Sequence, residues 1–140
     1  MNVSRSKLGK LNRNGVECVE AAVTLPLMLM VFFATVQLTH HWHIEKLLKI
    51  ASYEAMKVGA ASGGTQADAV AIFNQHTESL GIVGASLEFS GPSFESADVG
   101  ELLGCVATAP VESNEYPSPI SLGLPDTMAG GWVYARKEGL

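Results

Sequence analysis

One segment constrains the fold more than any other: the twenty residues VEAAVTLPLMLMVFFATVQL at 19–38, of which four are polar. A helix of about 20 residues crosses the hydrocarbon core of a bilayer, so this run is just long enough to span a membrane. A cleaved secretory signal is the alternative, but its apolar region usually has about 7 to 15 residues and ends at an A-x-A-like site. Residues 39–48 read THHWHIEKLL, without that pattern. The sequence therefore predicts a retained membrane anchor, with the lipid bilayer as a partner.

The charges of the chain are divided between its two ends. Four bases and no acid occur in residues 1–15, which leaves five of the nine bases and all fourteen acids in the rest. A basic flank before an apolar run predicts a cytoplasmic N-terminus, with the remainder on the other side of the inner membrane. Since the remainder is acidic, it offers no basic face for phosphates, and we expect no nucleic-acid partner.

Helical periodicity continues beyond the apolar run. Apolar residues recur at spacings of three and four along one stripe, namely at Ile44, Leu47, Leu48, Ala51, Ala55 and Val58. We expect one long helix over residues 16–62, roughly 70 Å in length, ending at the glycines of GAASGG. Pro26 lies inside it and lacks an N–H donor, which predicts either a simple kink or a point of local melting.

Small residues also recur on this helix, every fourth position, at Ala51, Ala55, Gly59 and Gly63. Such a row lets another backbone approach closely. We expect it to pack under the sheet of the external domain, and a partner helix is the alternative.

Residues 65–140 predict a small α+β domain. Thr65 and Asp68 resemble a capping box for a short helix that stops at Gly81. Alternating apolar residues predict strands at 85–90, 101–111 and 132–136, with a long loop rich in proline, serine and glycine at 112–131. Three strands and one short helix make a small core, so the long helix is expected to complete it. The predicted fold is pilin-like, with an antiparallel sheet of about three strands.

The cluster HHWH (40–43) follows the apolar run directly. A tryptophan among polar residues at the end of such a run is typical of a membrane interface, and we expect the cluster to anchor the chain there. Metal binding is the alternative, since His40 and His43 lie on one helical face. No Cys, Asp or Glu at ligand spacing completes a metal site nearby.

The chain shows no motif that would carry enzymatic chemistry. Cys105 lies in an apolar strand without a His or another base at a spacing that would activate it. Cys18 lies at the start of the apolar run, so we expect two free thiols. We find no glycine-rich phosphate loop or nucleophile elbow and predict a protein that is not an enzyme, with no cofactor and no small-molecule substrate.

Two glutamates, Glu17 and Glu20, stand where hydrocarbon would begin. An ionised carboxylate within a membrane costs about 2.5 to 3.5 kcal/mol on insertion scales, so it calls for a partner or for an escape to the interface. The positive end of the helix dipole offsets part of that cost. Counted from the end of the basic leader at Gly15, Val16 is the first residue and Glu20 the fifth. Without that glycine spacing, snorkelling of Glu20 to the headgroups would be the simpler interpretation.

The segment NGVECVEAAVTLPLMLMVFFATVQL resembles the start of the TadE-like pseudopilins of the tight-adherence, or Flp-type, pilus system. Their start reads R-x-G-x-x-x-V-E-F-A, followed by an apolar run with an early L-P. LLKIASYEAMKVGAAS is also similar to their A-L-x-x-A-A-x-E-G-A-R segment, so the resemblance covers residues 10–62. This chain has Asn14 before the glycine and Ala21 in place of the aromatic residue.

The resemblance implies that a prepilin peptidase cuts between Gly15 and Val16. It also implies that Glu20 pairs with the new ammonium group of a neighbouring subunit, and that Pro26 is the early proline of the family. Other pilin or pseudopilin subunits and the Tad secretion machinery are the implied partners. We therefore expect a membrane-anchored minor pilin or pseudopilin. The alternative is a single-pass protein whose external domain binds a ligand or a metal, with HHWH contributing.

Overall fold

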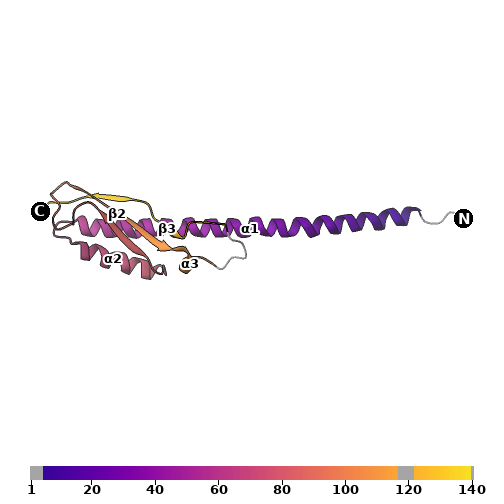
Figure 1. Ribbon diagram of the computed structural model, residues 1–140, viewed down its shortest axis with the longest axis horizontal. Helices are drawn as coiled ribbons and strands as arrows, with labels where there is room; N and C mark the ends of the chain where they lie inside the picture. Colours follow the sequence, from indigo (N-terminus) through magenta and orange to yellow (C-terminus); the bar gives the residue numbers. More distant parts are fainter. Residues whose placement is uncertain (1–4, 117–121, 140) are drawn as a thin grey trace.

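One long helix carries a small domain at its C-terminal end in the computed structural model, which describes residues 5–116 and 122–139 (Figure 1). The side chains are described from residue 15 onward. The order of elements is α1 (Arg5–Ala60), α2 (Gln66–Ser79), β1 (Ser86–Ser90), β2 (Leu102–Pro110), α3 (Val111–Asn114), β3 (Thr127–Ala129) and β4 (Val133–Arg136). The predicted α+β class, with a long helix, a short helix and an antiparallel sheet, is confirmed.

Helix α1 has 56 residues and begins at Arg5, well before the expected start at Val16. The leader continues the helix because its lysines, arginines and leucines are good helix formers, and Gly15 costs only about 1 kcal/mol in a helix. At about 1.5 Å per residue the helix is roughly 84 Å long. It runs without interruption through Pro26.

Helix α2 begins with the predicted capping box. The hydroxyl of Thr65 accepts a hydrogen bond from the backbone N–H of Asp68 (3.1 Å), and the carboxylate of Asp68 accepts one from the N–H of Thr65 (3.1 Å). The hydroxyl of Thr65 also donates a hydrogen bond to Asp68 Oδ2 (2.7 Å). This bond and the one from the Thr65 N–H hold the pKa of Asp68 below its usual value. Gly81, with φ of +71°, follows the end of the helix, as expected.

Strand β2 is the centre of an antiparallel sheet. It pairs with β1 along one edge and with β3 and β4 along the other. The three predicted strands are present. The fourth strand, β3, and all but the first residue of the short helix α3 lie within the stretch expected to be a loop. Residues 117–121 of that stretch fall outside the described part of the chain.

Strand β3 forms because of contacts that its own sequence does not show. Met128 is fully buried, and Gly130 donates its N–H to the carbonyl of Ala107 (2.9 Å). A Cβ at Gly130 would lie 2.6 Å from the backbone nitrogen of Lys49 on α1, so only glycine allows this close approach. The segment is thereby held between β2 and α1.

The core lies between the C-terminal half of α1, helix α2 and the inner face of the sheet. Ala51 and Ala55 are fully buried, and Gly59 faces Ala69 and Phe94. These contacts confirm that the small-residue row packs within the external domain. Gly63 does not belong to the row, because it lies beyond the end of α1 with φ of +76°.

Candidate processing, assembly and membrane site

The N-terminal half of α1 presents its apolar side chains to the outside. Val19, Leu25 and Phe32 are each more than 60% exposed. The most apolar stretch of the helix has none of its residues buried, which distinguishes it from the core helix of a folded domain. Length and composition make this stretch compatible with a single-pass membrane anchor.

Gly15 and Val16, the residues of the expected cleavage, lie within this exposed helix. Among the described residues, nothing comes within 4 Å of the position where Gly15 would carry a Cβ, and its backbone is helical. Neither packing nor a positive φ therefore requires glycine at this place. Its neighbour Val16 is 56% exposed, so the bond between them is open to another protein once the helix unwinds locally.

Glu20 lies one helical turn after Glu17, and both side chains are exposed. Thr24 donates its hydroxyl to the carbonyl of Glu20. Pro26, which lacks an N–H, leaves the carbonyl of Ala22 without its usual helical donor. The segment from Glu20 to Pro26 thus combines an exposed carboxylate with a helix that has lost one hydrogen bond.

The histidine cluster meets the external domain at the end of the apolar stretch. His40 Nε2 lies 2.8 Å from the carbonyl oxygen of Asn114, and its ring packs on that of Tyr116 with centroids 4.4 Å apart. His41 is only 4% exposed. The side chain of His41 therefore packs inside the domain, beside Glu115. The expected place of the cluster at a membrane interface stays a prediction. Trp42 remains 56% exposed.

His41 stands between two carboxylates. Its Nε2 lies 3.6 Å from Glu45 Oε1 on the same helix, and its Nδ1 lies 3.6 Å from Glu115 Oε1. Gln37 donates its amide Nε2 to Glu115 Oε2 at 3.3 Å. Three buried polar atoms here make no hydrogen bond within the described residues: Gln37 Oε1, His41 Nδ1 and Glu115 Oε1. We call this group, Gln37, His41, Glu45 and Glu115, the polar junction.

The polar junction does not have the geometry of a metal site. The two carboxylates face opposite nitrogens of the His41 ring, so one ion could not bind both of them and the ring at once. Residues 5–116 and 122–139 contain no group of three or more His, Cys, Asp or Glu arranged to hold a metal. The junction was missed from the sequence because Glu115 lies far from His41 along the chain.

Both thiols are free, in contrasting surroundings. Cys18 is exposed on α1, whereas Cys105 is buried with its Sγ 3.9 Å from the carbonyl oxygen of Ser52. Burial raises the pKa of Cys105 to about 11. Since the thiolate is the reactive form, Cys105 is a poor nucleophile at neutral pH.

Comparison with known proteins gives a match, and it lies within α1. The family model described as TadE-like protein matches residues 15–56. No curated protein and no solved structure gives a significant match. The matched segment begins at Gly15, includes the exposed apolar stretch and ends at Met56, which is buried in the core. Over this segment the chain is similar to TadE-like proteins, which confirms the resemblance indicated by its first residues.

Proposed function

We propose that this chain is a membrane-anchored pseudopilin or minor pilin that takes part in assembling a Flp-type pilus or a related secretion apparatus. One observation carries the proposal: the TadE-like match begins at the glycine of the expected cleavage and covers the exposed apolar half of α1. The proposed role is structural and not catalytic. The external domain would be held outside the inner membrane, with the basic N-terminal flank in the cytoplasm.

Processing would occur between Gly15 and Val16, with a prepilin peptidase as the partner. A peptidase needs an extended backbone at the bond it cuts, so α1 would have to open there. Glycine makes this opening easier, since it destabilises a helix interior by about 1 kcal/mol relative to alanine. Among the described residues no atom packs where Gly15 would carry a side chain, so the helical hydrogen bonds of α1 are what such opening must break.

Assembly would depend on Glu20. Cleavage would leave an ammonium group on Val16, and a neighbouring subunit could offer its Glu20 to that group within the membrane. A charge in hydrocarbon costs about 2.5 to 3.5 kcal/mol on insertion scales, so pairing two opposite charges favours association of the subunits. Pro26 would serve as a nearby weak point at which the helix adapts to its neighbours.

Mass spectrometry of the full chain, extracted from membranes that contain an active prepilin peptidase, tests the processing step. The expected mature chain begins at Val16, and Gly15→Ala should leave it uncut. Gly9→Ala is the matched control, because it changes another leader glycine and should be cut normally. A wild-type chain that keeps its leader under these conditions would contradict processing.

Replacement of the two glutamates tests the assembly step. Glu20→Ala should insert into the membrane and be cleaved but should fail to enter pili or secretion complexes. Glu17→Ala, one turn away, is the control and should assemble normally. Normal incorporation of the Glu20→Ala protein would refute the assembly role.

A further inference from the structure

The charges of the external domain are segregated in space. Residues 58–135 contain no lysine or arginine but nine acids. The five bases after residue 15 lie instead at Lys46, Lys49 and Lys57 on α1 and at Arg136 and Lys137 at the end of β4. One part of the domain therefore holds all of its permanent positive charge.

The positive charge forms part of a stripe along α1. Spacings of one, three and four residues place six exposed side chains on one side of the helix, and we call them the basic stripe: Trp42, Lys46, Lys49, Ile50, Tyr53 and Lys57. The three large apolar members are more than half exposed. The stripe thus combines cations with exposed apolar surface, so the expectation of no basic face after residue 15 is wrong for this part of α1.

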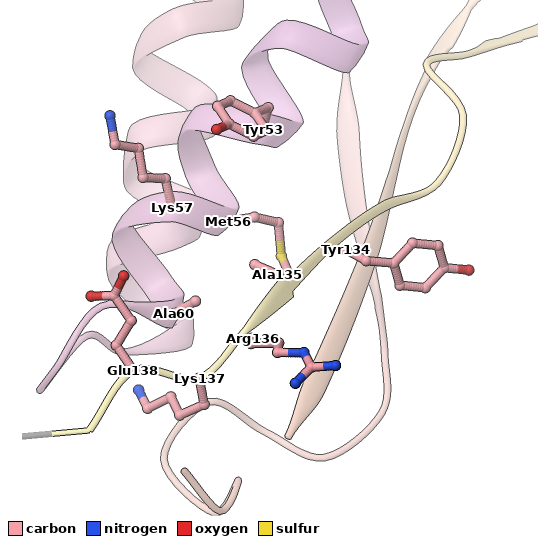
Figure 2. Close-up of a pocket in the computed structure, with 9 residues that line it drawn as sticks. All are labelled: Tyr53, Met56, Lys57, Ala60, Tyr134, Ala135, Arg136, Lys137 and Glu138. Carbon is pink, nitrogen blue, oxygen red and sulfur yellow. The ribbon is translucent and has the colours of Figure 1, made fainter. Parts of the chain in front are cut away.

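Shallow hollows lie between the basic stripe and the segment that runs from the end of β3 through β4. Three of them, of about 400, 330 and 270 Å³, follow the helix, and one is lined by Ile50, Tyr53 and Trp132. Figure 2 shows the largest, with Met56 and Ala135 between the helix and the strand. Two acids, Glu45 and Glu138, also line these hollows.

The strand side of the hollows is aromatic. Trp132 and Tyr134 stack with ring centroids 6.2 Å apart and are 49% and 58% exposed. The ring of Tyr134 lies against Gly104, where a Cβ would come within 2.9 Å of it. In Figure 2, Tyr134 and Arg136 point away from α1. Together with the basic stripe, Trp132 forms what we call the basic flank, whereas Tyr134 and Arg136 belong to the outer face of the sheet.

Lys137 has a different role. Its Nζ donates hydrogen bonds to the carbonyl oxygens of Gly59, Ala61 and Gly64 at 3.1 to 3.4 Å. It therefore caps the C-terminus of α1 and is not counted in the basic flank.

The opposite side of the domain is acidic. Helix α2 and β4 lie on opposite sides of α1 (Figure 1), and β1 is at the edge of the sheet away from β4. The exposed acids of α2 and of the loop after β1 are Asp68, Glu78 and Glu95, and no lysine or arginine occurs from residue 66 to 95. We call these three residues the acidic flank. Glu88 is not counted, because the strand register places it on the same outer face of the sheet as Tyr134.

We propose that the basic flank of one chain binds the acidic flank of a second copy of the same chain. Copies anchored in one bilayer by the same helix all point the same way across the membrane. Their external domains therefore meet side by side, flank against flank, and not end to end. Two basic flanks would repel each other, whereas a basic and an acidic flank attract. Exposed Trp132, Tyr53 and Ile50 supply the apolar contact that interfaces need at their centre.

The two flanks are different surfaces, so the contact is heterologous. Each copy keeps one free flank of each kind, and such a contact extends into a row or a helical array unless it closes into a ring. A lipid surface fits the basic flank less well, because Lys57 lies roughly 22 Å beyond Trp42 along the helix axis. The inference rests on the proposed membrane anchoring but on neither cleavage nor the pilus role.

Photocross-linking of the full chain in membranes without a prepilin peptidase tests the contact. A benzoylphenylalanine in place of Tyr53 should cross-link to residues 66–95 of a second copy. The same group in place of Tyr116, which is also exposed but lies outside both flanks, is the control and should not. Adducts from position 53 to lipid or to an unrelated protein would overturn the proposal.

Charge reversal provides the complementary test. Lys49→Glu with Lys57→Glu, and separately Glu78→Lys with Glu95→Lys, should each lower the yield of cross-linked dimer by about tenfold. Expressing the two variants together should restore it, because the reversed flanks attract each other. Failure of the mixture to cross-link, with both variants folded by circular dichroism, would refute the interface. A leader that stays uncut in the separate processing experiment would not affect this result.

Discussion

The two halves of helix α1 have similar apolar side chains in opposite surroundings. Leu25, in the N-terminal half, is 62% exposed, whereas Leu48, in the C-terminal half, is fully buried. In the first half apolar residues surround the helix, and in the second they form a stripe that faces the sheet and α2. The comparison teaches that one continuous helix contributes to the stability of the domain only where the chain folds back on it.

The boundary between the halves is marked by polar contacts. Gln37, His40 and His41 make polar contacts with Asn114 at the end of α3 and with Glu115 directly after it. Buried polar groups need partners, so these contacts tie the domain to the helix at the point where the proposed membrane span ends. Substitutions made in matched pairs, one in each half, can test how sharp this boundary is.

Leu48→Ala should have the largest effect. Truncating a fully buried leucine removes apolar contacts and leaves a cavity, with a typical loss of about 2 to 5 kcal/mol in the free energy of unfolding. Leu25→Ala is the matched control in the exposed half and should leave the domain unchanged. Thermal unfolding of the full chain in detergent, followed by near-ultraviolet circular dichroism, measures both. Equal losses in the two variants would contradict the comparison.

Gly59→Ala should have a smaller effect. The added Cβ would lie 3.0 Å from Ala69 Cβ and from Phe94 Cε1, so the packing of α2 on α1 must shift. We expect a loss of about 2 kcal/mol from overpacking, reduced by the better helix propensity of alanine. Gly15→Ala meets no such contact and should leave the domain as stable as before in the same unfolding assay. A stabilised Gly59→Ala protein would show that this contact is looser than its geometry indicates.

Thr65→Ala should cost about 1 kcal/mol, since it removes the side-chain acceptor at the start of α2. The pKa of Asp68 is lowered by the same capping box, so its contribution is present at neutral pH and is lost as the pH falls below its usual pKa. Thr24→Ala is the control: it removes the hydrogen bond from the Thr24 hydroxyl to the carbonyl of Glu20 in the exposed half of α1, and it should not change the stability of the domain. Chemical denaturation at pH 7 and at pH 3 separates the effect of the Thr65 cap from that of the ionised Asp68 carboxylate. If Thr65→Ala lowers the free energy of unfolding equally at both pH values, the two effects are not coupled.

Local sequence patterns predicted much of this fold. The apolar run, the stripe from Ile44 to Val58, the capping box at Thr65 and three of the strands each depend on neighbouring residues. Each of these patterns involves only residues within a few turns of one helix or within one strand. The same applies to the candidate site, where the spacing from Gly15 to Glu20 is visible without a structure.

The features that were missed depend on distant contacts. Strand β3 is three residues long, too short for alternation to be recognised, and it forms because Met128 and Gly130 fit against β2 and α1. The polar junction joins His41 to Glu115, and no local pattern links them. The early helix start was missed because the basic leader was interpreted from its charge and not from its helix propensity. A partner for Glu20 would lie on another subunit, beyond what one chain can show.

The two cysteines provide the mildest test, because they need no substitution. Cys105 should resist a maleimide at pH 7.5 while Cys18 reacts, since Cys105 is buried and its pKa is raised to about 11. The raised pKa means that the folded chain holds this proton more tightly than the unfolded chain. Its contribution to stability is therefore intact below the ordinary thiol pKa of 9.0 and is lost as the pH rises towards about 11. Mass spectrometry after labelling reports both sites, and rapid labelling of Cys105 at pH 7.5 would show that the core beside α1 opens more readily than its burial implies.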